Sequence, residues 1–167
     1  MKKKCLFIGT RIEALRTVEK LINVKLIITS KNSYIDNNRK NKILVDKKNK
    51  KKIHTLIDNM DVDIVFSAGY PYILSKKIIN NKKKIFLNSH PSYLPFYRGR
   101  KCIYEAYINR EKFYGVTLHI MDEMVDTGKI IYQEKVKQEN KKIEVIYNNI
   151  FKKLEPKVIK SGLKKIL

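Results

Sequence analysis

Short apolar runs alternate with amphipathic segments over the first half of this chain, and this alternation constrains its fold more than any other feature. Four runs have the length and character of buried strands: residues 4–9, 24–28, 64–66 and 84–88. Residues 14–22 and 52–60 lie between them and carry apolar side chains at helical spacing. Strands that alternate with helices in this way predict a doubly wound α/β domain on a mainly parallel sheet.

The second half of the chain predicts a different arrangement at one edge of the sheet. After a helix at residues 101–109, two strands at residues 114–121 and 129–136 are expected to pair antiparallel. A closing helix follows at residues 142–160, and Pro156 can kink or split it. Five residues are spaced for the buried face of this helix: Val145, Ile146, Asn149, Ile150 and Leu154.

Residues 31–52 interrupt the pattern, because this segment is polar and rich in lysine and asparagine. We expect it to run over the surface, with a short strand at most at residues 43–45, and we expect a short helix at residues 75–80. The chain contains no internal repeat and no linker-like stretch. Residues 1–167 are therefore expected to form a single domain.

The net charge of +21 admits two interpretations. A strongly basic surface can bind nucleic acid. However, only six of the 37 basic residues are arginines, and the other 31 are lysines scattered along the whole chain among asparagine and isoleucine. We favour compositional drift, with the lysines as solvated surface residues. The arginines are more informative, because a planar guanidinium suits anion binding and two of them, Arg98 and Arg100, lie close together.

Other features exclude a membrane protein and a disulfide-stapled one. No apolar stretch approaches the roughly 18–20 residues that a membrane span needs. The apolar run after Lys4 is too short for the core of a secretion signal, so we expect a cytoplasmic protein. The cysteines, Cys5 and Cys102, form no disulfide framework and no metal-ligand spacing. No metal is therefore expected.

Three polar residues carry the chemistry that the sequence predicts: Asn88, His90 and Asp126. Asn88 and His90 stand two residues apart at a strand end, so their side chains point to one face and Ser89 points to the other. An amide and a protonated imidazole can donate to the negative oxygen of a tetrahedral intermediate. An imidazole beside a carboxylate can accept the proton of an attacking amine. The trio therefore suits the transfer of a small acyl group to an amine.

Two motifs around these residues resemble the formyltransferases that use N10-formyltetrahydrofolate. Residues 88–99 match the Asn-x-His, Ser-x-Leu-Pro and Arg-Gly elements of the family signature. Residues 115–119 and 125–128 match the second signature, in the right order and at the right separation. The resemblance implies a Rossmann-like catalytic domain with N10-formyltetrahydrofolate as formyl donor. It also implies Asn88, His90 and Asp126 as the catalytic trio, and the motif offers no serine or cysteine nucleophile for an acyl-enzyme.

The resemblance further implies that the pterin of the donor lies against two loops, residues 68–74 and 121–126. Its contacts would come from Gly69, Tyr70, Tyr72, Ile73, Leu74, Met121 and Val125. Apolar side chains at these positions would pack against a flat heterocycle, while main-chain groups form hydrogen bonds with its edge.

The family formylates three kinds of amine, namely glycinamide ribonucleotide, methionyl-tRNA and amino sugars carried on nucleotides. The ribonucleotide enzymes open with a glycine-rich phosphate loop, where this chain has Gly9-Thr10-Arg11. The tRNA enzymes usually have glycine in place of Pro91 and add a C-terminal tRNA-binding domain, which is not expected here. The sugar enzymes are most similar at residues 70–74 and 114–119. We expect an amino-sugar nucleotide as acceptor, with tRNA and the ribonucleotide as alternatives.

Five residues are candidates for acceptor binding: Arg98, Arg100 and Lys101 at the diphosphate, Tyr97 at the pocket border, and Arg11. Simpler roles compete with these, since Arg98 could shape its loop through an ion pair and Asp126 could brace a turn. A structural role for His119, on a strand of apolar neighbours, is at least as well supported as a role in the site.

A catalytically idle relative of the family or a basic RNA-binding module stays an alternative for the whole protein. The oligomeric state is open, with a homodimer as one option.

Overall fold

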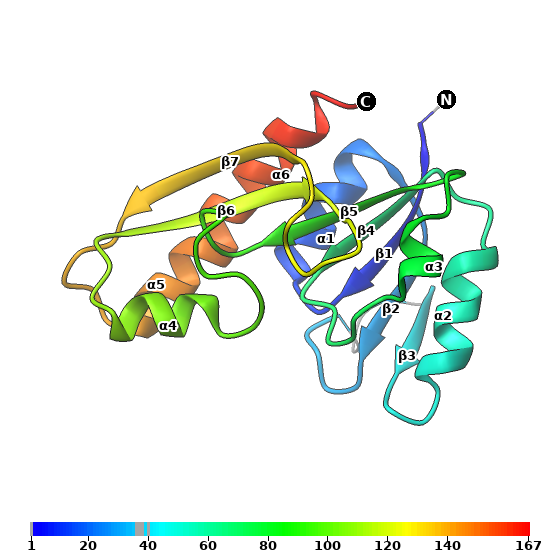
Figure 1. Cartoon of the computed structure of the whole chain (residues 1–167), viewed down its shortest axis with the longest axis horizontal. Helices are drawn as coiled ribbons and strands as arrows, with labels where there is room; N and C mark the ends of the chain where they lie inside the picture. Colours follow the sequence, from blue (N-terminus) through cyan, green and yellow to red (C-terminus); the bar gives the residue numbers. More distant parts are fainter. Residues whose placement is uncertain (1, 36–38, 40) are drawn as a thin grey trace.

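A computed structural model describes residues 2–35, 39 and 41–167, and these form one seven-stranded sheet with helices on both faces (Figure 1). The strands are β1 (Lys4–Gly9), β2 (Asn23–Ser30), β3 (Lys42–Val45), β4 (Ile64–Ala68), β5 (Ile85–His90), β6 (Phe113–Ile120) and β7 (Ile130–Lys137). The helices are α1 (Ile12–Leu21), α2 (Lys50–Asn59), α3 (Lys76–Ile79), α4 (Cys102–Ile108), α5 (Ile143–Asn149) and α6 (Glu155–Leu163), with a π-helical segment η2 (Ile150–Leu154) between the last two.

Both faces of the sheet are buried, because successive side chains of a strand point to opposite sides. In β1, Cys5 and Phe7 pack in one core cluster with residues of α1, α5, η2 and α6. Leu6 and Ile8 pack in a second cluster with residues of α2 and α3. A strand covered on both faces is apolar throughout rather than alternating, which is why 4–9 could be recognised as a buried strand.

The strand order, β3-β2-β1-β4-β5-β6-β7, places a topological switch point between β1 and β4. The pairings of β1 with β2 and β4, of β2 with β3 and of β4 with β5 are all parallel. In such sheets ligands bind beyond the carboxyl ends of the strands, where the order reverses. Gly9 ends β1 there with a φ of 141°, and a Cβ on it would lie 2.0 Å from the carbonyl oxygen of Ala68. Glycine is needed for this close approach of β1 to β4.

Most elements agree with the sequence-based prediction. The pair β6–β7 is antiparallel, as expected, and the short strand at 43–45 exists as the edge strand β3. The structure adds that β5 also pairs antiparallel with β6. Residues 36–38 and 40 of the expected surface segment lie outside the described residues. The predicted helix 142–160 is divided just before Pro156, whose ring and missing N–H prevent a regular α-helix through this point.

One residue of that closing helix was placed wrongly. Val145 was expected on the buried face but is 43% exposed. Ile146 and Ile150, one helical turn apart, are buried as predicted, and this register turns Val145 outward.

The loop between β6 and β7 folds back against β6 at Gly128. A Cβ at this position would lie 1.8 Å from the carbonyl oxygen of Ile120, and backbone cannot yield without displacing the loop. We predict that Gly128→Ala lowers the free energy of unfolding by about 1–3 kcal/mol, measured by urea denaturation. Lys129→Ala at the exposed neighbouring position is the control, with an expected change within about 0.5 kcal/mol. Equal unfolding midpoints for the two variants would contradict the close contact.

Candidate active site

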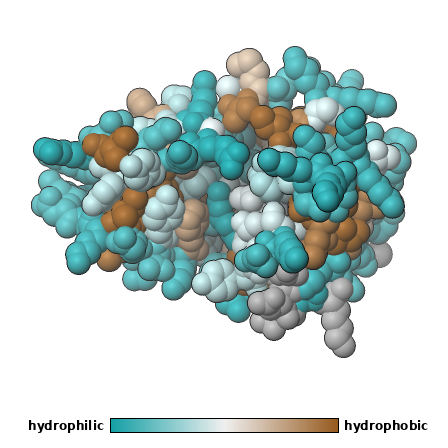
Figure 2. Space-filling model, turned by 90° about the horizontal axis from the view of Figure 1, so that it is seen from below, coloured by the Kyte–Doolittle hydropathy of each residue, from teal (hydrophilic) through white to brown (hydrophobic). Residues whose placement is uncertain are grey.

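A cavity of about 700 Å³ opens beyond the carboxyl ends of the central strands, within the size range of small-molecule sites. Seen from below, the surface is hollowed between the part that carries α4 and the part that carries α2 (Figure 2). Asn88, His90, His119 and Asp126 line this cavity. Segments far apart in the sequence therefore converge at the switch point, as the predicted topology requires.

The cavity wall has two halves, which continue the two core clusters of the sheet. One half comes from the loops after β4 and β6, and its partly buried residues Tyr70, Tyr72 and Met121 pack on the α2–α3 cluster. The other half comes from the chain after β1, the chain after β5 and the closing helices. Its main residues are Arg11, Ser89, Pro91, Arg100, Lys101, Cys102, Ile103, Tyr147 and Phe151.

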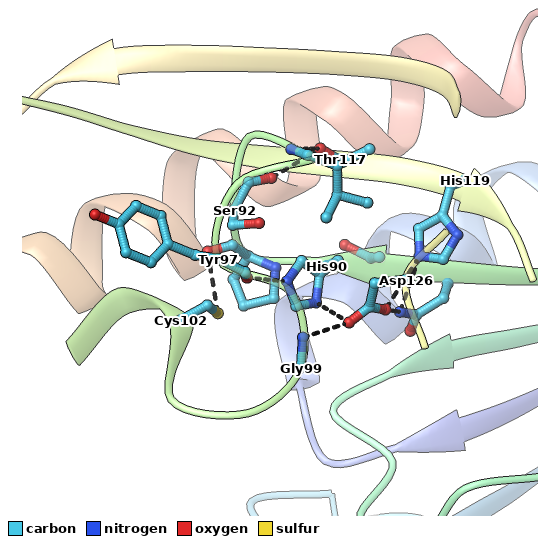
Figure 3. Close-up of polar contacts among 12 residues, drawn as sticks. His90, Ser92, Tyr97, Gly99, Cys102, Thr117, His119 and Asp126 are labelled. Carbon is cyan, nitrogen blue, oxygen red and sulfur yellow. Dashed lines mark hydrogen bonds and ion pairs between the residues drawn. The ribbon is translucent and has the colours of Figure 1, made fainter. Parts of the chain in front are cut away.

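Asp126 lies between the two histidines and receives contacts from four directions (Figure 3). Its Oδ1 accepts a hydrogen bond from Nδ2 of Asn88 at 3.1 Å and lies 3.4 Å from Nε2 of His119. Its Oδ2 accepts the backbone N–H of Gly99 at 2.8 Å and lies 3.2 Å from Nδ1 of His90. The structure therefore brings the predicted trio together and adds His119 to it.

The strand register explains how these side chains meet. Asn88 and His90 are two residues apart in β5 and point to the same face, while Ser89 between them donates to Glu155 on the opposite side. His119 in β6 stands directly across from Asn88 in the antiparallel pair. Its Nε2 is 3.2 Å from Nδ2 of Asn88, so the pairing of β5 with β6 builds half of the site.

Three residues with a left-handed backbone lie around the same carboxylate. Tyr97 and Asp126 both have a φ of 54°, and Gly99 has a φ of 80°. These residues face the site with main-chain or carboxylate groups: the carbonyl of Tyr97 contacts Nε2 of His90 at 2.9 Å, and the N–H of Gly99 binds Asp126. Left-handed conformations of non-glycine residues are costly and cluster at functional sites, where the surroundings enforce them.

The hydrogen bonds fix the protonation of the site. A carbonyl only accepts, so Nε2 of His90 carries a proton toward Tyr97, while Nδ1 of His119 lies 2.9 Å from the carbonyl of Ile120. Burial lowers the pKa of His90 below its ordinary 6.5, although the Asp126 carboxylate and the Tyr97 carbonyl oppose the shift. His90 is therefore uncharged at neutral pH, with Nδ1 free to take up a proton beside a carboxylate.

Asp126 itself stays ionised. Burial raises the pKa of this carboxyl, but the hydrogen bond from His119, the positive charge that His90 gains at acid pH and the N–H of Gly99 together hold the pKa below its ordinary 3.8. A proton that reaches Nδ1 of His90 is thus stabilised by a fixed negative charge at 3.2 Å. An imidazole beside an ionised carboxylate is chemically able to accept a proton from a reacting group.

The other sequence-predicted residues divide into two sets. All seven residues expected at the donor line the cavity: Gly69, Tyr70, Tyr72, Ile73, Leu74, Met121 and Val125. Arg11, Arg100 and Lys101 of the acceptor set line it as well. Tyr97 and Arg98 are not among the described residues of its wall. The hydroxyl of Tyr97 instead donates to Glu111 and accepts from Asn109.

Two residues that the sequence prediction left out belong to this region. For His119 a structural role and a role in the site were left as alternatives, because the position of a lone histidine on a strand does not reveal its cross-strand partner. Glu155, which accepts a hydrogen bond from Arg11, could have been recognised from the sequence. It stands at helical spacing in the apolar stripe of Phe151, Val158 and Ile159, so an acidic side chain was predictable at a core position.

The cysteines and the metal-binding side chains add nothing to the catalytic contacts. Both thiols are buried, and burial raises the pKa of Cys5 to about 12 and that of Cys102 to about 11, so neither is a thiolate at neutral pH. Over the described ranges, no group of three or more His, Cys, Asp or Glu is placed to hold a metal ion. No helix in the same part of the chain is long and apolar enough to cross a membrane.

A doubly wound sheet with an amide, imidazoles and a carboxylate at its switch point is a Rossmann-like domain with a group-transfer type of site. Comparison with known families agrees: the formyl transferase family matches residues 11–163. The chain belongs to this family.

Individual relatives have different acceptors in their names. Methionyl-tRNA formyltransferase of Finegoldia magna is 25% identical over 173 residues, which cover 92% of this chain and 55% of that protein. GDP-perosamine N-formyltransferase of Brucella melitensis is 38% identical over 81 residues, which cover 48% of this chain and 31% of that protein. The chain thus spans about half or less of these curated relatives.

A solved structure matches the whole chain. Phosphoribosylglycinamide formyltransferase from Bacillus halodurans has a TM-score of 0.84 at 25% identity, over 99% of this chain and 95% of that one. Three kinds of formyltransferase are therefore similar to this chain, and they differ in the amine that their names imply.

The titration of His90 tests the site geometry. We predict that His90, followed by NMR, titrates below pH 6.5 because burial lowers its pKa. The unfolded chain then binds more protons here, so the contribution of His90 to stability is complete above pH 6.5 and is lost as the pH falls toward the folded-state pKa. Asp126→Asn should move the titration to still lower pH, since the opposing carboxylate is gone. Glu123→Gln, an exposed change in the same loop, is the control, and equal titrations in all three proteins would rule out the contact.

Proposed function

We propose that this chain transfers a formyl group from N10-formyltetrahydrofolate to the primary amine of a nucleotide-linked amino sugar. The observation that carries the proposal is the convergence of Asn88, His90 and Asp126 on the wall of one cavity. Membership of the formyl transferase family supports the reaction class. Residues 1–167 then act as one catalytic domain, in the cytoplasm, where the reduced folate is made and used.

The α2–α3 half of the cavity suits the donor. Its aromatic and aliphatic side chains, Tyr70, Tyr72, Leu74 and Met121, offer a flat apolar slot for a pterin. Ile73 and Val125 are 77% and 47% exposed, although both line the cavity. Burial of such apolar surface under a ligand is favourable, at about 25 cal/mol per Å² removed from water.

The reaction follows from the arrangement of the trio. The acceptor amine attacks the formyl carbon, and a C–N bond forms while the carbonyl oxygen gains negative charge. Asn88 donates to that oxygen through the Nδ2 proton that Asp126 does not accept, giving up its contact with His119, and a donor of this kind is worth about 3 kcal/mol. The pair of His90 and Asp126 takes up the amine proton, and Asp126 stabilises the resulting imidazolium. The bond from carbon to N10 then breaks, N10 receives the proton, and the products are the formamide and tetrahydrofolate.

The other half of the cavity suits a phosphorylated acceptor. Arg11, Arg100 and Lys101 place three cationic side chains on its wall, and Tyr147 and Phe151 add aromatic surface. A nucleoside diphosphate offers two phosphates for the cations and a base for the rings. The similarity to GDP-perosamine N-formyltransferase supports this acceptor class.

Methionyl-tRNA is the second candidate. The similarity to the Finegoldia magna enzyme covers 92% of the chain, and the net charge of +21 would favour a polyanion. This candidate needs nucleic-acid contacts outside the cavity.

An assay with labelled N10-formyltetrahydrofolate against a panel of amines tests the proposal. The panel holds several amino-sugar nucleotides, charged initiator tRNA and glycinamide ribonucleotide. We predict label transfer to an amino-sugar nucleotide, and a loss of turnover by about 10²- to 10⁴-fold in His90→Ala and Asp126→Asn. If the label is transferred to tRNA alone, the amino-sugar nucleotide is wrong as the acceptor, while formyl transfer as the reaction is retained.

Matched controls separate catalysis from folding. Lys129→Ala removes an exposed charge from the end of the loop of Asp126, and Arg16→Met removes an exposed charge from α1; neither residue lines the cavity. Both should keep turnover within about an order of magnitude of the unmodified protein. Near-normal turnover in folded Asp126→Asn protein, or a trapped covalent formyl-enzyme, would refute the mechanism.

A further inference from the structure

The switch point holds a second polar cluster, made of Arg11, Ser89 and Glu155, which the catalytic contacts do not use. Glu155 at the start of α6 is fully buried, with a relative exposure of 0%. Its Oε1 accepts from Nη1 of Arg11 at 2.5 Å and from Oγ of Ser89 at 2.6 Å. The same Nη1 donates to the carbonyl of Ser89 at 3.1 Å. The cluster thus joins the chain after β1 to β5 and to α6.

Packing alone does not explain this cluster. Burial of a carboxylate and a guanidinium is costly, and an apolar pair of similar volume would hold the same elements together at least as well. Oε2 of Glu155 is also buried without a hydrogen-bond partner among the described residues. The arrangement therefore costs folding free energy, and its effect is to hold the positive charge of Arg11 in one place.

That place is the acceptor half of the cavity. The Arg11 side chain is 18% exposed and lines the cavity, and its guanidinium carbon lies 4.9 Å from the centre of the Phe151 ring. Glu155, Ser89 and Phe151 thus fix the position of the group. Nη1 is occupied, whereas Nε and Nη2 donate to no acceptor in the described part of the chain. One edge of the guanidinium is left for a ligand.

We infer that Arg11 binds a phosphate of the acceptor through this edge and that Glu155 is the positioning residue that holds Arg11 ready. The inference rests on the proposed function, since it assumes a phosphorylated acceptor. A guanidinium can bind a phosphate through two parallel N–H bonds. A group held in its bound conformation beforehand also avoids the cost of ordering a flexible side chain on binding.

The position of Arg11 is consistent with binding close to the reacting atoms. Its charge contributes to the lowered pKa of His90, so the two side chains interact within the same cavity. Ser89, which bonds Glu155, lies between Asn88 and His90 in β5. The cluster therefore also ties the phosphate-binding group to the strand that carries the catalytic residues.

Calorimetric titration with pyrophosphate tests the inference without an identified acceptor. Arg11→Met should raise the Kd for pyrophosphate about tenfold or more, because a charge-assisted pair is lost. Glu155→Gln should raise it about threefold or more, because the guanidinium loses its anchor. The Kd for 5-formyltetrahydrofolate, a stable relative of the donor, should stay within about twofold in both variants.

Arg16→Met and Glu13→Gln are the matched controls. This pair, also an arginine with a glutamate, lies in α1 with a distance of 2.6 Å, but its side chains are 57% and 34% exposed. Both changes should leave the two dissociation constants unaltered. If Arg11→Met does not fold, Arg11→Gln keeps hydrogen-bond donors without the charge and should show the same loss of pyrophosphate binding.

The outcomes separate the inference from the proposed function. Folded Arg11 and Glu155 variants that melt earlier but bind pyrophosphate as before would show a structural brace and overturn the inference. Pyrophosphate binding that depends on Arg11, together with no formyl transfer to any amine of the panel, would support the inference and refute the proposed function alone.

Discussion

The carboxylate of Asp126 is the interaction on which the site depends. It is held by Asn88 and His90 from β5, by His119 from β6 and by the backbone of Gly99, so three separate segments besides its own loop must be in place at once. Contacts to the two imidazoles and to a backbone N–H keep it ionised despite burial. In the proposed reaction, this charge lets His90 act as a proton acceptor that is neutral beforehand and stabilised as a cation during the transfer.

The fold supplies this constellation through the point where its topology changes. The parallel part of the sheet ends at β5, and the antiparallel strands β6 and β7 add the second histidine and the loop of Asp126. Gly9 and Gly128 allow the two close backbone approaches that shape the cavity, at Ala68 and at Ile120. A mixed sheet therefore combines a ligand crevice of the doubly wound type with catalytic groups from an added hairpin.

Local patterns predicted the elements well, because a buried parallel strand and an amphipathic helix are visible in a short window of sequence. The trio was also predictable, since Asn88 and His90 share a face by the period of a strand. The role of His119 was not, because it follows from the register between β5 and β6, which no local pattern contains. Arg98 and Tyr97 fail to reach the cavity wall for a similar reason: loop conformation, with its left-handed residues, decides where they point.

An experimental structure with a bound 10-formyl folate analogue tests the central claim most directly. The measured quantities are the distances from the formyl group to Nδ2 of Asn88 and to the ring nitrogens of His90. The account predicts that the pterin lies against the loops after β4 and β6. The formyl oxygen should lie about 3 Å from Nδ2 of Asn88, and the formyl carbon should lie within about 4 Å of a ring nitrogen of His90. A folate bound elsewhere, or a formyl group that lies about 10 Å or more from all three side chains, would contradict it.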